Sequence, residues 1–289
     1  MSTPSLGRLG LWSPELRLSN RAEAASVAAE IESLGFGTLW IPGRIDNQVL
    51  DDVAHLLAAT ESICVATGIL NLWLHEPTDV AKWFLALPKR DQRRVMLGVG
   101  VSHRPLIGEV WQKPVVATRE FCDALLDAGL PSDNLCLGAL GPQMITLARD
   151  LTAGAHPFLT TPAHTQKARD ILGVGKLLAP VQGFIREQTA ERAYAIARAA
   201  LVKYLKLPNY CNHWLRWGFT QADLDTASDR LVDELFAWGS AAIIANRVQA
   251  HWLAGADHVA VQLVRGAAPG DLPSVVAACR ELAGVLLPA

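Results

Sequence analysis

The sequence predicts an α/β fold in which eight parallel strands alternate with helices and close into a (β/α)8 barrel. Eight short apolar runs are nearly continuous rather than alternating, which is typical of parallel strands covered on both faces. Helical patterns fill the gaps between the runs, and many of them end near a glycine such as Gly35 or Gly129. No linker interrupts the alternation. A doubly wound sheet is the alternative.

The expected elements follow one another along the whole chain. The runs that we interpret as strands cover residues 9–12, 38–42, 63–69, 95–100, 135–141, 156–160, 177–185 and 258–264. The helical patterns cover residues 20–34, 50–60, 78–87, 118–127, 143–151, 165–172, 189–205 and 241–253. Several of these helices begin at plausible N-caps, such as Asn20 and Thr165.

The spacing is irregular between the seventh and eighth strands. Residues 186–257 separate them, which is far more chain than one helix needs. The middle of this segment, residues 207–220, is aromatic, polar and rich in turn residues. It is either a surface excursion that packs on its own helices, or a lid, pocket wall or dimer contact. We therefore expect one barrel domain over residues 1–289 with an insertion at about 186–240.

Composition excludes several classes of function. The net charge is −2, so nothing favours nucleic acid or an anionic membrane surface as a partner. No apolar run is long enough to span a bilayer, and the N-terminus has no signal-peptide pattern, which predicts a cytoplasmic protein. The five cysteines are odd in number and form no CxxC pair, so we interpret them as buried thiols in a reducing compartment.

The motifs of self-sufficient catalysis are missing from the sequence. There is no HExxH, no CxxC pair and no His/Asp cluster at metal-ligand spacing, so we expect no metal. There is also no GxSxG or Walker A motif, and the pair Gly98 and Gly100 lacks the third glycine of a dinucleotide fingerprint. A chain of this kind often takes its chemistry from an organic cofactor.

The carboxyl ends of the strands are where a barrel of this type places its active site. A buried strand at residues 95–97 runs into Gly98 and Gly100, and Ser102 and His103 follow. His103 titrates near neutrality and is the candidate acid/base group, although a structural donor is the commoner role of such a histidine. Arg44, after the second strand, either pairs with an anionic cofactor or substrate or lies on the rim.

Two further strand ends look suited to phosphate and to a flat ring. Gly141 opens a helix, whose free N–H groups and dipole favour an anion, and Thr160 and Thr161 offer hydroxyls before the next helix. The alternative is that these residues are ordinary N-caps. Asn71 and Trp73 suit polar and stacking contacts to a ring, or simple packing.

These strand-end residues resemble the bacterial luciferase-like superfamily, and more narrowly its branch that uses coenzyme F420, a deazaflavin. The most specific segments are residues 63–77 and 94–105. The resemblance continues through residues 139–142, 178–180, 207–210, 228–233 and 254–259, and so covers essentially the whole chain.

The resemblance implies a barrel with an insertion, usually dimeric, in which a deazaflavin, or FMN in other branches, lies across the strand ends. It also implies a non-proline cis peptide at about Gly68–Ile69. The residues that we assign to cofactor binding on this basis are Trp40, Gly68, Ile69, Asn71, Gly100, Ser102, Leu140, Gly141, Thr160 and Thr161. We assign His103 and Arg44 to catalysis.

The sequence departs from the family pattern in several places. Arg44 and His103 stand where sugar-phosphate dehydrogenases of the superfamily have His and Glu, and Ala163 replaces a lysine of the phosphate loop. Many relatives have a Glu where this chain has Gly43. The sugar-phosphate activity is therefore not carried over.

The leading hypothesis is a deazaflavin (coenzyme F420)-dependent oxidoreductase that transfers a hydride between the cofactor and a small organic substrate. The first alternative is an FMNH2-dependent monooxygenase, which would consume oxygen and need a partner reductase. The second is a non-catalytic flavin- or deazaflavin-binding protein, which Gly43 and Ala163 make possible.

Overall fold

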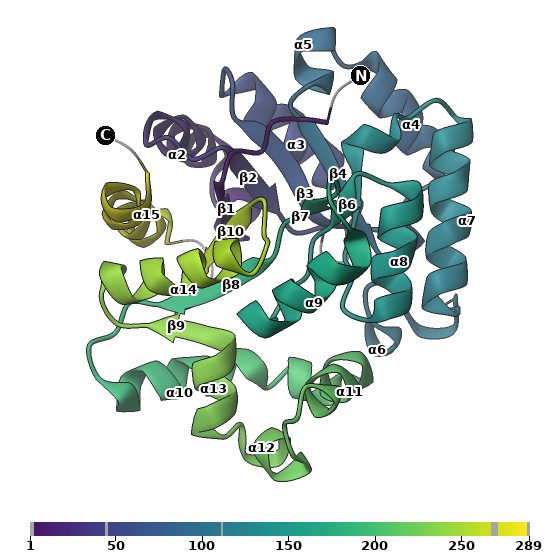
Figure 1. Cartoon of the computed structure of the whole chain (residues 1–289). Helices are drawn as coiled ribbons and strands as arrows, with labels where there is room; N and C mark the ends of the chain where they lie inside the picture. Colours follow the sequence, from purple (N-terminus) through teal and green to yellow (C-terminus); the bar gives the residue numbers. More distant parts are fainter. Residues whose placement is uncertain (1–2, 44–45, 111, 267–270, 288–289) are drawn as a thin grey trace.

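The structure is a computed structural model of the chain, and it describes residues 3–43, 46–110, 112–266 and 271–287. Within these residues the chain forms ten parallel strands in one sheet (Figure 1). They are β1 (Leu9–Trp12), β2 (Thr38–Ile41), β3 (Cys64–Asn71), β4 (Val95–Gly100), β5 (Leu135–Leu137), β6 (Gly154–Ala155), β7 (Leu177–Leu178), β8 (Val181–Ile185), β9 (Phe236–Trp238) and β10 (Val259–Leu263).

Helices connect the strands. The α-helices are α1 (Glu15–Leu18), α2 (Arg21–Ser33), α3 (Val49–Ala58), α4 (Pro77–Ala86), α5 (Lys89–Gln92), α6 (Arg104–Ile107), α7 (Pro114–Asp127), α8 (Pro142–Leu151), α9 (Pro162–Leu172), α10 (Ala190–Leu201), α11 (Pro208–Arg216), α12 (Gln221–Thr226), α13 (Asp229–Leu235), α14 (Ala241–Leu253) and α15 (Leu272–Leu286). Short 3-10 turns are η1 (Leu72–Leu74), η2 (Gly108–Val110), η3 (Ser132–Asn134) and η4 (Tyr204–Lys206).

The sheet curls round into a barrel. Its strand order is β7-β6-β5-β4-β3-β2-β1-β10-β8-β9. Only Ala179 and Pro180 separate β7, which pairs with β6, from β8, which pairs with β10, so the chain itself joins the two arms of the sheet. A bridge between Phe158 and Val181 adds a further contact across this seam. The predicted barrel class is therefore confirmed.

A ring of helices covers the outside of the barrel. Helix α2 packs on α3, α4 on α7, α7 on α8, α8 on α9, α9 on α14, α14 on α15, and α15 on α2. Apolar residues between this ring and the strands form the largest core. A smaller cluster that includes Trp12, Trp40, Met96 and Cys136 draws on side chains of the opposite strand faces, inside the barrel. Burial raises the pKa of the Cys64 thiol in the same cluster to about 12.

The insertion lies where the sequence places it, between β8 and α14. Helices α10 to α13 lie together at one end of the molecule, and the chain then returns to the sheet as β9 (Figure 1). Their apolar side chains form a core cluster of their own, which includes Leu201, Trp214 and Leu231. The strand β9 pairs with β8 alone, and the sequence pattern does not predict it.

The predicted sixth strand is wrong. Residues 156–160 were expected to be extended, but β6 ends at Ala155 and Phe158 makes only an isolated bridge. Pro157 has no N–H to give to a ladder, and Leu159 takes a positive φ of 54°, so this run cannot continue as a strand. The predicted seventh strand is interrupted at Pro180 for the same reason. No helix in the part of the chain that the structure describes is long and apolar enough to cross a membrane.

Candidate functional site

A cleft of about 590 Å³ opens at the carboxyl ends of the strands. Its lining comes from the ends of β1 to β6 and β10 and from the insertion. The lining residues are Trp12, Pro14, Leu18, Pro42, Gly43, Gly68, Ile69, Asn71, Gly100, Val101, Ser102, His103, Gly138, Ala139, Leu140, His156, Phe158, Lys203, Tyr204, Leu207, Asn209, Tyr210 and Gln262. This volume is within the usual range of small-molecule and cofactor sites.

The floor of the cleft is built around Ile69. The peptide bond Gly68–Ile69 is cis, as the family resemblance predicts, and the β3–β4 register shifts between Thr67 and Leu70. A Cβ on Gly100 would lie 2.9 Å from Ile69 Cγ1, and one on Gly138 would lie 3.1 Å from Ile69 Cγ2. Glycine at these two positions therefore lets the neighbouring strand ends approach the Ile69 side chain closely.

Asn71 offers an unused donor to this cleft. Its Oδ1 accepts a hydrogen bond from the backbone N–H of Trp73 at 3.3 Å, which caps η1. Its Nδ2 is buried and has no partner among the described residues. A buried amide group without a partner is costly in water-excluded surroundings, so this N–H is well placed for an acceptor on a bound molecule.

His156 and Trp40 form a stack beneath the cleft. Their ring centroids are 3.8 Å apart and nearly parallel, and Trp40 Nε1 donates to His258 Nε2 at 3.0 Å. His156 Nδ1 bonds the Ala179 carbonyl at 2.7 Å, while Nε2 has no partner. Burial lowers the pKa of His156 to about 3, so the ring is neutral and Nε2 is an acceptor. Trp40 is fully buried and does not line the cleft, contrary to its predicted contact with the cofactor.

His103 stands at the side of the cleft next to the insertion. The centroid of its ring lies 5.6 Å from the centroid of the Tyr210 ring, and the imidazole forms a hydrogen bond with the Asn209 side chain. Nδ1 is buried without a partner. Burial lowers the pKa of His103, the Asn209 hydrogen bond opposes that shift, and the charge of Lys203 adds to it. The imidazole is therefore neutral near pH 7. The preceding residue, Ser102, takes a positive φ of 52°.

The residues predicted to bind phosphate gather beside the cleft but do not line it, apart from Leu140. Gly141 is the N-cap of α8, which lacks a side-chain cap. Thr161 caps α9 through a 3.2 Å bond from the His164 N–H, whereas the buried Thr160 hydroxyl has no partner. Thr161 is therefore an N-cap, whereas the adjacent Thr160 has a hydroxyl free for a ligand.

One cation approaches this region from the insertion. Arg216, the last residue of α11, has its Nη2 3.8 Å from where a Gly141 Cβ would lie. The sequence pattern did not single it out. His164 Nε2 donates to the Leu140 carbonyl at 3.0 Å, and burial holds the pKa of His164 at about 4. A neutral His164 thus braces the Leu140–Gly141 turn.

The predicted site and the observed cleft differ in several residues. Arg44 falls outside the described residues. Within the described ranges no group of three His, Cys, Asp or Glu side chains is arranged to hold a metal ion. Sequence reasoning missed His156, Phe158, Lys203, Tyr204 and Asn209 as lining residues. His156 and Phe158 were placed within the incorrect sixth strand. Lys203 and Tyr204 fall within the predicted helix at 189–205, and Asn209 falls within 207–220, the segment interpreted either as a surface excursion or as a lid, pocket wall or dimer contact.

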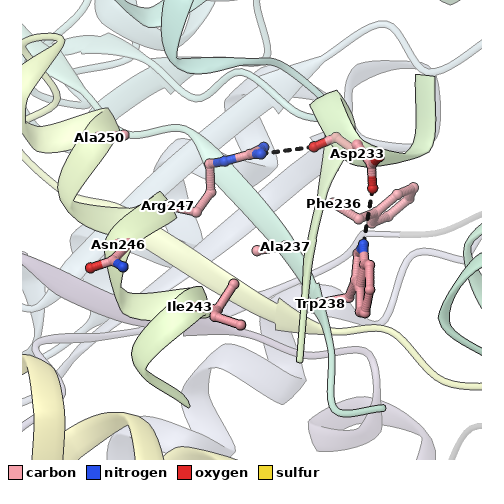
Figure 2. A pocket seen from close by; sticks show the side chains of 8 residues that line it. All are labelled: Asp233, Phe236, Ala237, Trp238, Ile243, Asn246, Arg247 and Ala250. Carbon is pink, nitrogen blue, oxygen red and sulfur yellow. Dashed lines mark hydrogen bonds between the residues drawn. The ribbon is translucent and has the colours of Figure 1, made fainter. Parts of the chain in front are cut away.

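A second cavity of about 490 Å³ lies between β9 and α14 and is mostly apolar (Figure 2). Asp233 accepts a hydrogen bond from Trp238 Nε1 at 2.9 Å, and Arg247 donates to the Asp233 and Glu234 carbonyls at 2.7 and 2.8 Å. Asp233, Trp238 and Arg247 are thus paired with one another or with a backbone carbonyl. This cavity has none of the unpartnered donors and acceptors found at the strand ends.

Comparison with known proteins agrees with the motifs. Residues 8–130, from β1 through α7, match the family described as luciferase-like monooxygenase. A curated relative, a putative coenzyme F420-dependent oxidoreductase of Mycobacterium tuberculosis, is 28% identical over 120 residues. That match covers 40% of this chain and 33% of the relative, so the chain aligns with only about a third of that protein.

Solved structures match over nearly the whole chain at low identity. An F420-dependent secondary alcohol dehydrogenase with an F420-acetone adduct has a TM-score of 0.70 at 15% identity and is covered in full, as is this chain. The oxygenating constituent of 3,6-diketocamphane monooxygenase from Pseudomonas putida, in complex with FMN, has a TM-score of 0.65 at 14% identity. The match covers 98% of this chain and 100% of that protein. These likenesses show the fold. Together the comparisons confirm the predicted resemblance to the luciferase-like superfamily.

Proposed function

Given this resemblance, we propose that the protein is an F420-dependent oxidoreductase that transfers a hydride between the deazaflavin and a small organic substrate. The observation that carries the proposal is the floor of the cleft. Gly100 and Gly138 make room for the Ile69 side chain, which lines the cleft, and the unpartnered Asn71 Nδ2 belongs to a residue of the same lining. A flat heterocycle with acceptor atoms along its edge suits both features.

The region beside Leu140 suits the anionic tail of such a cofactor. The first turn of α8 has free N–H groups and the positive end of the helix dipole, which favour an anion. The unpartnered Thr160 hydroxyl and the Arg216 guanidinium are the second and third groups that favour negative charge there. In this proposal Arg216 provides the charge that a lysine at the position of Ala163 provides in relatives.

The bound deazaflavin supplies a carbon that accepts or donates a hydride. The chain supplies orientation and a proton-transfer group. When an alcohol is oxidised, its oxygen would give up a proton, for which His103 Nδ1 would be the acceptor, and its carbon would give up a hydride to the bound cofactor. In the reverse direction His103 returns the proton to the oxygen of a carbonyl. The lowered pKa of His103 keeps it neutral and ready to accept.

Binding measurements on the purified protein test this proposal. We expect oxidised or reduced F420 to bind at micromolar concentration, followed by its absorbance. Gly100→Ala should weaken that binding by about 10-fold, because its Cβ displaces Ile69 from the floor. Gly284→Ala is the matched control, because nothing lies near its Cβ.

Two outcomes would overturn the proposal. Binding of FMN but not F420, with oxygen consumed when FMN is reduced, would assign the chain to the monooxygenase alternative. Tight F420 binding without turnover across a broad panel of alcohols and carbonyl compounds would favour the non-catalytic alternative.

A further inference from the structure

The charge of the cleft carries an inference about the substrate. Among the described lining residues Lys203 is the one side chain with a full charge at neutral pH, because the two histidines are neutral and no Asp or Glu takes part. Within the part of the chain that the structure describes, no carboxylate forms an ion pair with it. The cleft therefore presents a positive charge without a counter-ion.

The surroundings of Lys203 hold this charge at an aromatic wall. Its Nζ stands 4.8 Å from the centroid of the Tyr204 ring, a cation–π contact. The Tyr204 ring centroid lies 5.6 Å from that of Phe158 and 5.1 Å from that of Tyr210, so the exposed Lys203 side chain lies beside a wall of three aromatic rings. Burial lowers the pKa of Lys203, and no neighbouring carboxylate opposes that shift. An unpaired ammonium against an apolar wall gains more from an anion than one in open water does.

His103 lies within the electrostatic reach of the same ammonium, since the charge of Lys203 helps to lower its pKa. The proton-transfer group and the cation thus belong to one part of the cleft, at the insertion. Resting on the proposed function, we infer that the substrate is a small organic carboxylate that carries an alcohol or carbonyl group, with its carboxylate held by Lys203. In oxidation the alcohol carbon loses a hydride to the deazaflavin, its oxygen loses a proton to His103, and the carboxylate is unchanged.

Paired ligands separate this inference from simple shape recognition. The probes are lactate, 3-hydroxybutyrate, mandelate and benzoate, each beside its primary amide, which has nearly the same shape but no charge. Binding is followed by calorimetry on the protein without and with its cofactor. We expect at least one acid to bind about 10-fold more tightly than its amide, the effect of one well-placed charge.

Variants assign the preference to one residue. Lys203→Met should reduce the acid-to-amide ratio to within about 2-fold, and Lys203→Arg should restore most of it. Lys206→Met is the matched control: Lys206 ends η4, is exposed like Lys203 and does not line the cleft, so its loss should leave the ratio unchanged.

The inference is overturned if no acid binds, if acids and amides bind alike, or if Lys203→Met keeps the preference. It is also overturned if Lys203→Met acts by weakening the binding of F420, since Lys203 would then hold the cofactor. Failure of the proposed function gives a different result: the wild-type protein would bind no F420, whereas a Lys203-dependent acid preference would persist without cofactor.

Discussion

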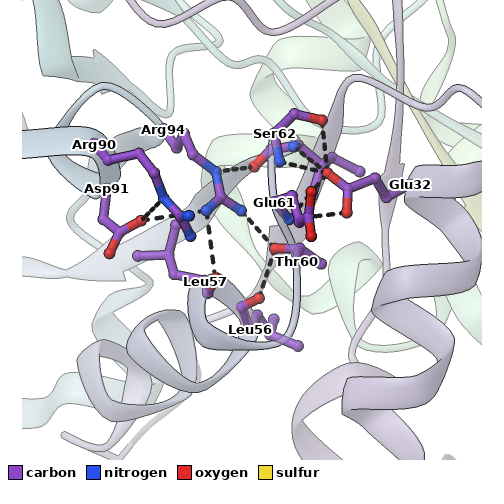
Figure 3. A network of polar contacts seen from close by, with 10 residues as sticks. Glu32, Leu56, Leu57, Thr60, Glu61, Ser62, Arg90, Asp91 and Arg94 are labelled. Carbon is purple, nitrogen blue, oxygen red and sulfur yellow. Dashed lines mark hydrogen bonds and ion pairs between the residues drawn. The ribbon is translucent and has the colours of Figure 1, made fainter.

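The two ends of the barrel differ in how completely their buried polar side chains are paired. At the N-terminal end, Arg94 precedes β4 and is almost fully buried (Figure 3). Its guanidinium donates to the Ile63 carbonyl at 3.1 Å and to Thr60 Oγ1 at 2.6 Å, and it pairs with Asp91 at 3.2 Å. This one side chain ties the starts of β3 and β4 to the end of α3.

Glu32 does the same on the adjacent side of this end (Figure 3). Its carboxylate accepts hydrogen bonds from the backbone N–H groups of Glu61, Ser62 and Ile63 and from the Ser62 hydroxyl. Burial opposes the charged form, but these hydrogen bonds outweigh it and lower the pKa of Glu32 to about 2. The Glu32 carboxylate thus holds residues 61–63, which lead into β3.

At the C-terminal end of the barrel, by contrast, many buried polar side chains have no partner. Among the described residues, nine buried side-chain N or O atoms lack a partner, and seven of them belong to a strand end or to the segment that follows it. These seven are Asn71 Nδ2, His75 Nε2, His103 Nδ1, His156 Nε2, Thr160 Oγ1, His164 Nδ1 and Arg265 Nε. A barrel that pairs most of its buried polar groups at one end and leaves many unpaired at the other is stabilised at the first and ready for a ligand at the second.

The largest expected effect comes from the unpaired end. His103→Gln should lower turnover of an accepted alcohol by about 100- to 10,000-fold, as expected for loss of a proton-transfer group. F420 binding and the unfolding midpoint should stay close to wild type. In the wild-type protein, oxidation should slow as pH falls through the lowered pKa of His103, because the base becomes protonated. The variant should lack this acidic limb. An unchanged rate would remove His103 from the chemistry.

Next comes the paired end. Arg94→Met should lower the free energy of unfolding by about 3 kcal/mol, because it leaves buried hydrogen-bond partners unsatisfied. Urea denaturation measures this. Arg90→Met is the control: Arg90 also pairs with Asp91 but is mostly exposed, so the loss should be under about 1 kcal/mol. Equal losses for the two variants would mean that pairing at this end does not stabilise the barrel.

The smallest effect is also pH-dependent. Glu32→Gln should lower the free energy of unfolding by about 1 kcal/mol at pH 7. This value is small because the Glu32 side chain is partly exposed to solvent. Because the folded-state pKa is lowered, the wild-type advantage is present above about pH 4.5 and disappears as pH falls towards 2. Urea denaturation at pH 7 and pH 3 measures the change. Glu30→Gln, in a surface pair with Arg280, should change stability less at both pH values.

Strand ends that stop at glycine were predictable because the pattern is local. Gly68, Ile69, Asn71 and Gly100 all lie in the cleft, where the sequence places them. Trp40 shows the limit of this reasoning. Both faces of a parallel strand are apolar, so the sequence does not distinguish a side chain that points into the cleft from one buried under it.

The insertion could not be read in the same way. Lys203 and Tyr204 line the cleft at a point where Tyr204 packs on Phe158, a residue distant in the sequence. The strand β9 depends on pairing with β8 at a separation of about fifty residues. Arg216 meets Gly141 for the same kind of reason. Neither hydrophobic periodicity nor motif spacing predicts such contacts between residues distant in the sequence.

The separate core of the insertion has a consequence for how the chain can diversify. Tyr210 belongs both to that core and to the wall of the cleft, while Ile69 lies against Gly100 and Gly138 of the barrel. Substitutions among Leu201, Trp214 and Leu231 therefore reshape the wall from behind and leave the floor in place. Under the proposed function, changes in the insertion can therefore alter the choice of substrate while the barrel continues to hold the same cofactor.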